Sequence, residues 1–150
     1  MALGQLSLKG RALRLLSGRE HSRAELERKL ASREEEPGQL RQVLDELQAR
    51  DFISDQRAAD SVVHRRSAKL GVGRIRQELQ AKGLGAELVQ QAVAGLKSTE
   101  LARAREIWQR RYAAAPQDAA ERGRQMRFLA ARGFDGDVIR RVVSGAALED

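Results

Sequence analysis

The side chains that could do acid–base or metal chemistry are few in this chain of 150 residues. Its two histidines, His21 and His64, stand outside the HxxxH and HExxH metal spacings, and we interpret both as structural or solvent-facing. The adjacent carboxylates Asp45 and Glu46 fall on solvent-facing positions of a predicted helix, so paired-carboxylate catalysis is not expected. The chain has no cysteine, which excludes a disulfide, a thiolate metal site and a thiol nucleophile. The sequence therefore predicts no catalytic residue, no metal site and no cofactor, and we expect that the protein is not an enzyme.

A short glycine motif, Gly-Val-Gly at residues 71–73, precedes a predicted helix in the manner of a phosphate-binding loop. The motif lacks a preceding strand and the lysine of a Walker loop. We therefore interpret Gly71 and Gly73 as a break between two helices.

Arginine placement is more informative than the acids and the histidines. On a helical wheel, Arg66 falls within the apolar stripe of Ala59, Val62 and Val63, and Arg65 lies on the flank of that stripe. Two interpretations follow for Arg66. Its stem could run along apolar surface to an internal carboxylate or carbonyl partner, or its guanidinium could be presented to a concave binding surface.

The net charge of +7 is unevenly distributed along the chain. Residues 9–55 hold ten basic and ten acidic residues, whereas residues 56–82 hold seven basic and two acidic, and residues 100–144 hold ten basic and six acidic. A cationic face of this kind is typical of a protein that meets nucleic acid or an acidic protein surface, although a solvated face is the alternative.

The elements that carry these cations are all predicted to be helices. Every long segment has helical periodicity, and proline occurs only at Pro37 and Pro116. Ser22 and Glu25 have the spacing of a capping box, and a later helix is predicted to begin with Pro37 at its first position. The sequence therefore indicates an all-α fold.

An internal repeat organises these helices. Residues 131–143 (ARGFDGDVIRRVV) have the same skeleton as residues 81–93 (AKGLGAELVQQAV). We interpret each as a turn between two helices, in which Gly83 or Gly133 takes the left-handed conformation that ends the first helix. A weaker copy lies upstream, in residues 30–44, and has Glu34 where the glycine would stand.

The residues after each turn are predicted to fill the core and cap the next helix. Leu84 and Phe134 are each predicted to be buried in a small core, and the cap of the next helix follows one residue later. Asp135 is the best of the predicted capping residues, and Glu36 is the poorest.

The repeat predicts an elongated, curved array of three tandem three-helix repeats, with about nine helices in total. A composition of 33% charged residues and only five aromatic residues favours several small cores over one large core. The predicted boundaries are residues 1–9 for a flexible amino terminus, 10–53, 54–97 and 98–145 for the three repeats, and 146–150 for a tail. No signal peptide or membrane-spanning run is present in the sequence, so we expect a soluble, cytoplasmic protein.

Four segments carry a resemblance to a known family. They are REHSRAELERKL (residues 19–30), DFISDQRAAD (51–60), RRSAKLGVGRIRQELQAKGL (65–84) and FLAARGFDGDVI (128–139). In this order they resemble the RecX family, regulators of the RecA recombinase, over about residues 10–143. Arg66 matches the usual arginine of the family, and Ala58 stands where the family often has an aromatic residue.

The resemblance implies binding to RecA and to the RecA filament on single-stranded DNA, and suppression of the ATPase, strand exchange and co-protease functions of RecA. It places the chain in homologous recombination, DNA repair and the SOS response. The implied mechanism is occupation of the filament groove without a cofactor, and we expect a monomer that does not bind membranes. The face expected to bind RecA and DNA lies on repeats 2 and 3 and comprises Arg65, Arg66, Arg74, Arg76, Lys82, Arg110, Arg111, Arg132, Arg140 and Arg141.

An alternative function is direct DNA binding by a helix-turn-helix module. Residues 23–54 alone have the pattern of such a module. Its third helix, however, offers only Arg41 and Arg50 as cations, which is poor for a recognition helix.

Overall fold

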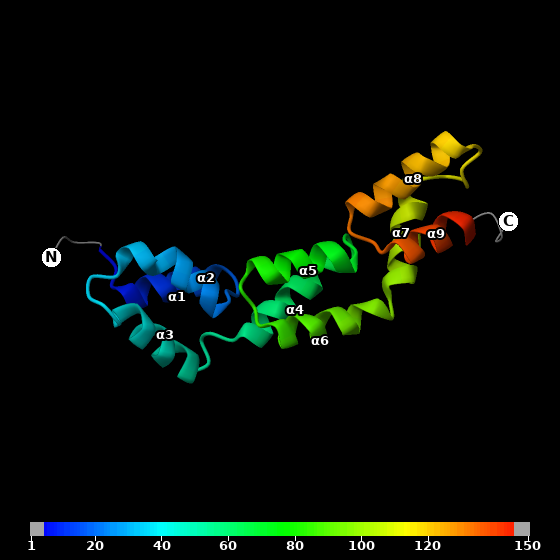
Figure 1. The fold of residues 1–150 in the computed structure, drawn as a ribbon. Helices are drawn as coiled ribbons and strands as arrows, with labels where there is room; N and C mark the ends of the chain where they lie inside the picture. Colours follow the sequence, from blue (N-terminus) through cyan, green and yellow to red (C-terminus); the bar gives the residue numbers. More distant parts are fainter. Residues whose placement is uncertain (1–4, 146–150) are drawn as a thin grey trace.

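The computed structural model describes residues 5–145 and confirms the all-α prediction, with nine α-helices, one short 3-10 helix and no strand in that range. The helices are α1 (Leu8–Gly18), α2 (Arg23–Leu30), η1 (Ala31–Arg33), α3 (Gln39–Ala49), α4 (Asp55–Arg66), α5 (Val72–Ala81), α6 (Ala86–Lys97), α7 (Glu100–Arg111), α8 (Ala119–Ala131) and α9 (Gly136–Gly145). Figure 1 shows three successive three-helix bundles in an elongated array, with the last bundle inclined to the first two.

Helix α1 begins two residues before the predicted start of repeat 1 at residue 10. Residues 1–4 of the predicted flexible terminus and the predicted tail, 146–150, lie outside the described residues. None of the described helices has the length and apolar character needed to cross a membrane.

Each repeat has its own core, as the composition predicts. Leu26, Leu44 and Leu47 are fully buried in repeat 1, and Ile75 and Leu79 occupy the same role in repeat 2. The core of repeat 3 consists of Ala104, Ile107, Trp108, Leu129, Phe134, Ile139, Val142 and Val143. Burial of one leucine or isoleucine side chain contributes roughly 1.5–3 kcal/mol to the stability of the folded state. Cores of this size therefore depend on support from neighbouring repeats.

The predicted caps at Ser22 and Asp135 form as expected. Ser22 and Glu25 form a complete capping box, in which each side chain accepts the backbone N–H of the other residue. Ser54 caps α4 by accepting the Arg57 N–H at 3.1 Å. At α9, Asp135 accepts a backbone N–H from the first turn at 3.0 Å.

The turn of repeat 1 differs from the prediction. Helix α3 begins at Gln39, with Gly38 as its N-cap, so the predicted start at Pro37 and the predicted cap at Glu36 are wrong. Gly38 has a φ of +86°, whereas Glu34 has a φ of −72°. A left-handed backbone is costly for a residue with a side chain, so the reversal moves from Glu34 to the next glycine along the chain.

The turns of the other two repeats agree with the prediction. Gly83 has a φ of +71° and Gly133 a φ of +90°, and each follows a C-cap cation, Lys82 or Arg132. Leu84 and Phe134 are buried after the turns. Helix α6 begins after Gly85, which offers no capping side chain.

The junction between repeats 2 and 3 is a direct contact of backbones. The Gly71 N–H donates to the Arg132 carbonyl at 2.8 Å, and the Gly73 N–H donates to the Gly133 carbonyl at 2.9 Å. A Cβ at Gly71 would lie 2.5 Å from the Gly133 carbonyl carbon. Gly73 lies inside the first turn of α5, so the prediction that it breaks the helix is wrong, and both glycines serve this close approach.

Repeats 1 and 2 also meet at a turn, and here the donors are side chains. The turn after α5 packs on the start of α2, where the Ser22 hydroxyl donates to the Lys82 carbonyl and Arg28 donates to the Ala81 carbonyl at 2.7 Å. A Cβ at Gly83 would lie 2.6 Å from the Ala24 methyl group. Thus the turns of repeats 2 and 3 each dock on the second helix of the preceding repeat.

Arg103 also links repeats 2 and 3. Its guanidinium donates to the carbonyls of Ser67 and Leu70, both at 2.8 Å, and to that of Leu96 at 3.1 Å. These carbonyls follow α4 and end α6, so one side chain ties α7 to two helix ends.

Candidate nucleic-acid and protein interface

The two histidines have different surroundings. His21 is 2% exposed, with one ring nitrogen 3.1 Å from the Arg19 carbonyl and the other 3.2 Å from Lys29 Nζ. Burial is the largest cause of a lowered pKa for His21. His64 is exposed on α4. Within residues 5–145, no group of three or more His, Asp or Glu side chains is placed to hold a metal ion.

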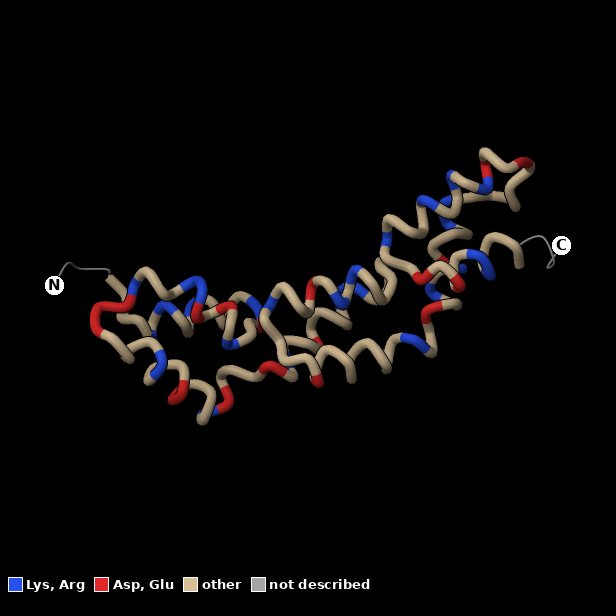
Figure 2. The backbone as a smooth tube through the Cα atoms, in the orientation of Figure 1, with Lys and Arg blue, Asp and Glu red and all other residues tan. Residues whose placement is uncertain are grey.

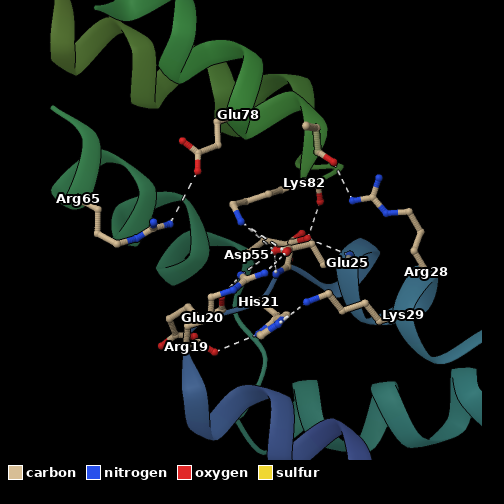
Figure 3. A network of polar contacts seen from close by, with 12 residues as sticks. Arg19, Glu20, His21, Glu25, Arg28, Lys29, Asp55, Arg65, Glu78 and Lys82 are labelled. Atoms are coloured by element: carbon tan, nitrogen blue, oxygen red, sulfur yellow. Dashed lines mark hydrogen bonds and ion pairs between the residues drawn. The ribbon is translucent and has the colours of Figure 1, made fainter. Parts of the chain in front are cut away.

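Glu25 lies at the centre of a polar network between repeats 1 and 2 (Figure 3). Its carboxylate is 2.7 Å from Arg19 Nη2 and 3.4 Å from Lys82 Nζ, and it accepts the Ser22 N–H. Burial acts to raise the pKa of Glu25, but these hydrogen bonds and positive charges outweigh it and lower the pKa to about 2.

Two of the predicted interface residues are engaged at junctions. The Lys82 side chain is only 13% exposed and pairs with Glu25. Arg74 is exposed on α5, and its Nη1 donates to the Ala131 carbonyl at 3.0 Å. Both side chains therefore have structural roles between repeats.

Arg65 and Arg66 share one carboxylate. Arg66 Nε lies 3.2 Å from Glu78, and Arg65 Nη2 lies 4.0 Å from the same side chain. Arg66 therefore follows the first of the two interpretations, with an internal carboxylate partner, while its side chain remains 42% exposed.

Arg76 lies apart from those residues. It lines a hollow of about 590 Å³ between repeats 2 and 3, together with Lys97, Glu100 and Phe134. Glu100 is buried and accepts the Asp135 N–H at 2.9 Å. Arg76 and Lys97 make no ion pair or hydrogen bond within the described part of the chain.

Three predicted cations converge on a second hollow, of about 240 Å³. We name it the Phe128 hollow, and its lining is Ala68, Lys69, Ile107, Arg110, Arg111, Phe128 and Arg132. The guanidinium carbons of Arg132 and Arg111 lie 4.9 Å and 5.9 Å from the Phe128 ring centroid. Tyr112 meets the same ring edge-on at 5.6 Å. The result is an aromatic ring held among cations.

The last two predicted residues, Arg140 and Arg141, are exposed on α9. Arg140 forms an ion pair with Asp137 of its own helix. No partner of Arg141 is found among residues 5–145. The structure therefore divides the predicted face into residues at the junctions, residues paired with Glu78, Arg76 at the hollow of about 590 Å³, the Phe128 hollow and α9.

Several exposed cations were missed from the sequence. Arg124 and Arg127 lie on one side of α8, opposite buried Gln125 and Leu129, and neither has an ion pair or hydrogen bond to another described residue. Their spacing of three residues on a predicted helix was a signal that could have found them. No local pattern marks Lys69 or Phe128 as neighbours of Arg111.

Residues 9–55 hold equal numbers of basic and acidic residues, and some of these charges form ion pairs within repeat 1 or with α4. Arg23 pairs with Asp45 at 2.6 Å, Lys9 pairs with Glu46 at 2.7 Å, and Arg57 of α4 pairs with Glu20 at 3.0 Å. Figure 2 shows basic and acidic positions intermixed in repeat 1 and mainly basic positions along α8. The surplus positive charge therefore belongs to repeats 2 and 3.

Family models match each of the three bundles. The RecX first three-helix domain matches residues 9–47, the second matches residues 54–93, and the third matches residues 98–143. These ranges coincide closely with the repeats in the structure.

The chain is also similar to curated and solved proteins. It is 56% identical over 139 residues to regulatory protein RecX of Leptothrix cholodnii, covering 93% of this chain and 88% of that protein. It is 47% identical to regulatory protein RecX of Ralstonia nicotianae, covering 94% and 89%. The crystal structure of RecX from Lactobacillus salivarius superposes with a TM-score of 0.80 at 21% identity, covering 94% and 95%.

Proposed function

Because this chain belongs to the RecX family, we propose that it regulates, and mainly inhibits, the RecA recombinase by binding the RecA filament on single-stranded DNA. The array would lie in the filament groove and suppress ATP hydrolysis, strand exchange and co-protease function. The family name of the relatives supports a regulatory role, and the resemblance to the RecX family implies RecA as the partner. The arrangement of charge supports contact with an anionic surface.

The observation that carries this proposal is the contrast in net charge along the array. Residues 9–55 hold ten basic and ten acidic residues, whereas residues 56–82 carry a surplus of five positive charges and residues 100–144 a surplus of four. Arg124 and Arg127 are exposed on α8 and have no carboxylate partner in residues 5–145. A surplus of positive charge on two of the three repeats suits a polyanionic partner or an acidic protein surface.

The proposed mechanism is competitive occupation of the groove. An array of three rigid bundles can contact more than one subunit of a helical filament, because its repeats follow one another in a line (Figure 1). Its cations would approach the phosphates of the bound strand. Incoming duplex DNA would then be excluded, and the subunits could not rearrange as hydrolysis requires.

The test is ATP hydrolysis by RecA on single-stranded DNA, measured during titration with this protein. We expect the rate to fall at protein concentrations well below a large excess. The variant Arg124→Glu/Arg127→Glu reverses two unpaired cations on α8 and should inhibit less. The matched control Arg14→Glu/Arg41→Glu makes the same charge change at exposed arginines of repeat 1, and it should inhibit like the wild type.

A wild-type protein that leaves the hydrolysis rate unchanged over a broad titration would refute the proposal. Equal loss of inhibition in the two double variants would refute the role of the charge asymmetry.

The second candidate, a direct DNA-binding helix-turn-helix module, predicts a different pattern. Such a module binds duplex DNA alone with sequence preference and has no effect on RecA. Gel shifts with duplex and single-stranded DNA, run beside the hydrolysis assay, separate the two functions.

A further inference from the structure

The Phe128 hollow combines four cations with an aromatic ring and has no carboxylate in its lining. Of the four, Arg110 has a carboxylate partner, Glu106 at 2.6 Å on the same helix. Lys69 comes from the segment after α4, while Arg111 and Arg132 end α7 and α8. The positive charge is thus concentrated by tertiary structure and not by a run in the sequence.

The donors of this hollow are mostly unused. Among residues 5–145, the Arg132 side chain makes one long hydrogen bond, 3.5 Å to the Lys69 carbonyl, and the Arg111 side chain makes no hydrogen bond and lies near the Tyr112 and Phe128 rings. A guanidinium carries five N–H donors, so most of them remain available to an acceptor.

The Phe128 ring favours a nucleic-acid strand over an acidic peptide as the ligand. An acidic peptide requires cations alone, whereas a single nucleic-acid strand offers both phosphates and bases, and the bases stack on aromatic rings and on guanidinium planes. The hollow is smaller than the 300–1,000 Å³ typical of pockets that enclose a small molecule. It can accept part of a polymer, such as one base, while the rest of the strand lies outside.

We propose that the Phe128 hollow seats one nucleotide of single-stranded DNA. The base stacks against the Phe128 and Arg132 pair, and Lys69, Arg110 and Arg111 contact the flanking phosphates. This inference rests on the proposed function, because it identifies where the array would touch the strand inside the filament. It also places the contact at the junction of repeats 2 and 3, so a bound strand would brace the two repeats together.

The experiment measures fluorescence anisotropy of labelled oligo(dT) and of an abasic strand of equal length. The variant Phe128→Leu keeps an apolar side chain but removes the ring. We expect it to weaken oligo(dT) binding by about 5- to 150-fold, the range of one stacked base, and to leave abasic binding unchanged. Phe52→Leu is the matched control, because Phe52 is an exposed ring 5.8 Å from Arg50 in the neutral repeat, and it should bind like the wild type.

A salt titration tests the phosphate contacts separately. Lys69→Gln/Arg111→Gln should lower the slope of log affinity against log salt by roughly 0.7 for each lost contact, on both strands. Phe128→Leu should leave that slope unchanged, since it removes no charge. Far-ultraviolet circular dichroism confirms that each variant retains its helices.

Wild-type affinity of Phe128→Leu for oligo(dT) would overturn the proposal, and so would equal losses on the oligo(dT) and abasic strands. Displacement of the wild type by polyglutamate with no preference for oligo(dT) over the abasic strand would assign the hollow to an acidic protein surface instead. The RecA hydrolysis assay keeps the two claims apart. If the wild type inhibits RecA normally but binds the oligo(dT) and abasic strands equally well, only the nucleotide site in the Phe128 hollow is overturned. If the wild type does not inhibit RecA, only the regulatory function is overturned.

Discussion

Gly133→Ala tests the junction between repeats 2 and 3 with the smallest available side chain. Gly133 has a φ of +90°, and its new Cβ would lie 2.5 Å from the Arg74 backbone nitrogen. Backbone atoms cannot rotate away as a flexible side chain would, so the turn must move off α5. That movement removes the hydrogen bonds from Gly71 and Gly73, at 2.8 and 2.9 Å.

The expected loss of stability can be estimated from these terms. The left-handed backbone costs about 1–2 kcal/mol for alanine, and two lost hydrogen bonds cost about 0.5–1.5 kcal/mol each. The reduced freedom of the unfolded chain returns about 0.4–1 kcal/mol. We therefore expect Gly133→Ala to reduce the free energy of unfolding by about 1–4.5 kcal/mol, with a central value of about 3 kcal/mol.

Gly38→Ala is the matched control. Gly38 has nearly the same backbone, with a φ of +86°, but no atom lies within 4 Å of its new Cβ. Its cost should be the backbone cost alone, about 1 kcal/mol. Urea denaturation, followed by circular dichroism and by the fluorescence of Trp108 in repeat 3, measures both variants. Equal losses in the two would show that the close approach contributes nothing and would refute this account of the junction.

Three further predictions concern buried polar groups. Glu25 has a pKa of about 2 in the folded protein against an ordinary 4.5, so its stabilisation of about 3 kcal/mol is present above pH 4.5 and is lost as the pH falls towards 2. Glu25→Gln should flatten the dependence of unfolding free energy on pH in that window, and an unchanged slope would contradict the role of the network. Gln125→Leu leaves the Trp108 indole N–H without its 2.8 Å acceptor and should cost about 1–3 kcal/mol in thermal denaturation. Arg103→Met removes the side-chain donor of the Ser67 and Leu70 carbonyls, whereas the Leu96 carbonyl keeps Thr99 as a donor. The variant should cost about 2–4 kcal/mol in the same measurement, while Arg124→Met on α8 should cost little.

Local rules predicted the parts of the fold that depend on short-range chemistry. The capping box at Ser22 and the left-handed turns at Gly83 and Gly133 involve residues a few positions apart, so the sequence contains the whole interaction. The same rules missed Gly38, because the weak copy of the repeat aligned Glu34 with the glycines. A backbone reversal follows the residue able to adopt it, not the alignment.

The candidate interface was harder to predict, because it depends on contacts between repeats. Lys82 and Arg74 look like surface cations in the sequence, yet the docking of each turn on the preceding repeat directs one to Glu25 and the other to the Ala131 carbonyl. Conversely, Lys69 and Arg132 are 63 positions apart and meet in one hollow. Helical periodicity assigns residues to faces, but it cannot tell which face the next repeat covers.

The repeated junction also explains why Arg124 is left exposed in repeat 3. Arg124 stands at the position of repeat 3 that Arg74 holds in repeat 2, fifty residues earlier. Arg74 donates to the turn of the following repeat, whereas no further repeat is docked on α8 in the described chain, and Arg124 remains exposed without a partner there. An arginine that bonds carbonyl oxygens inside the array has the same donors to offer phosphate or carboxylate oxygens at its end. We therefore expect Arg124 to donate hydrogen bonds to a partner, as Arg74 donates to the Ala131 carbonyl between repeats. For this reason Arg124 belongs in the variant that tests inhibition of RecA.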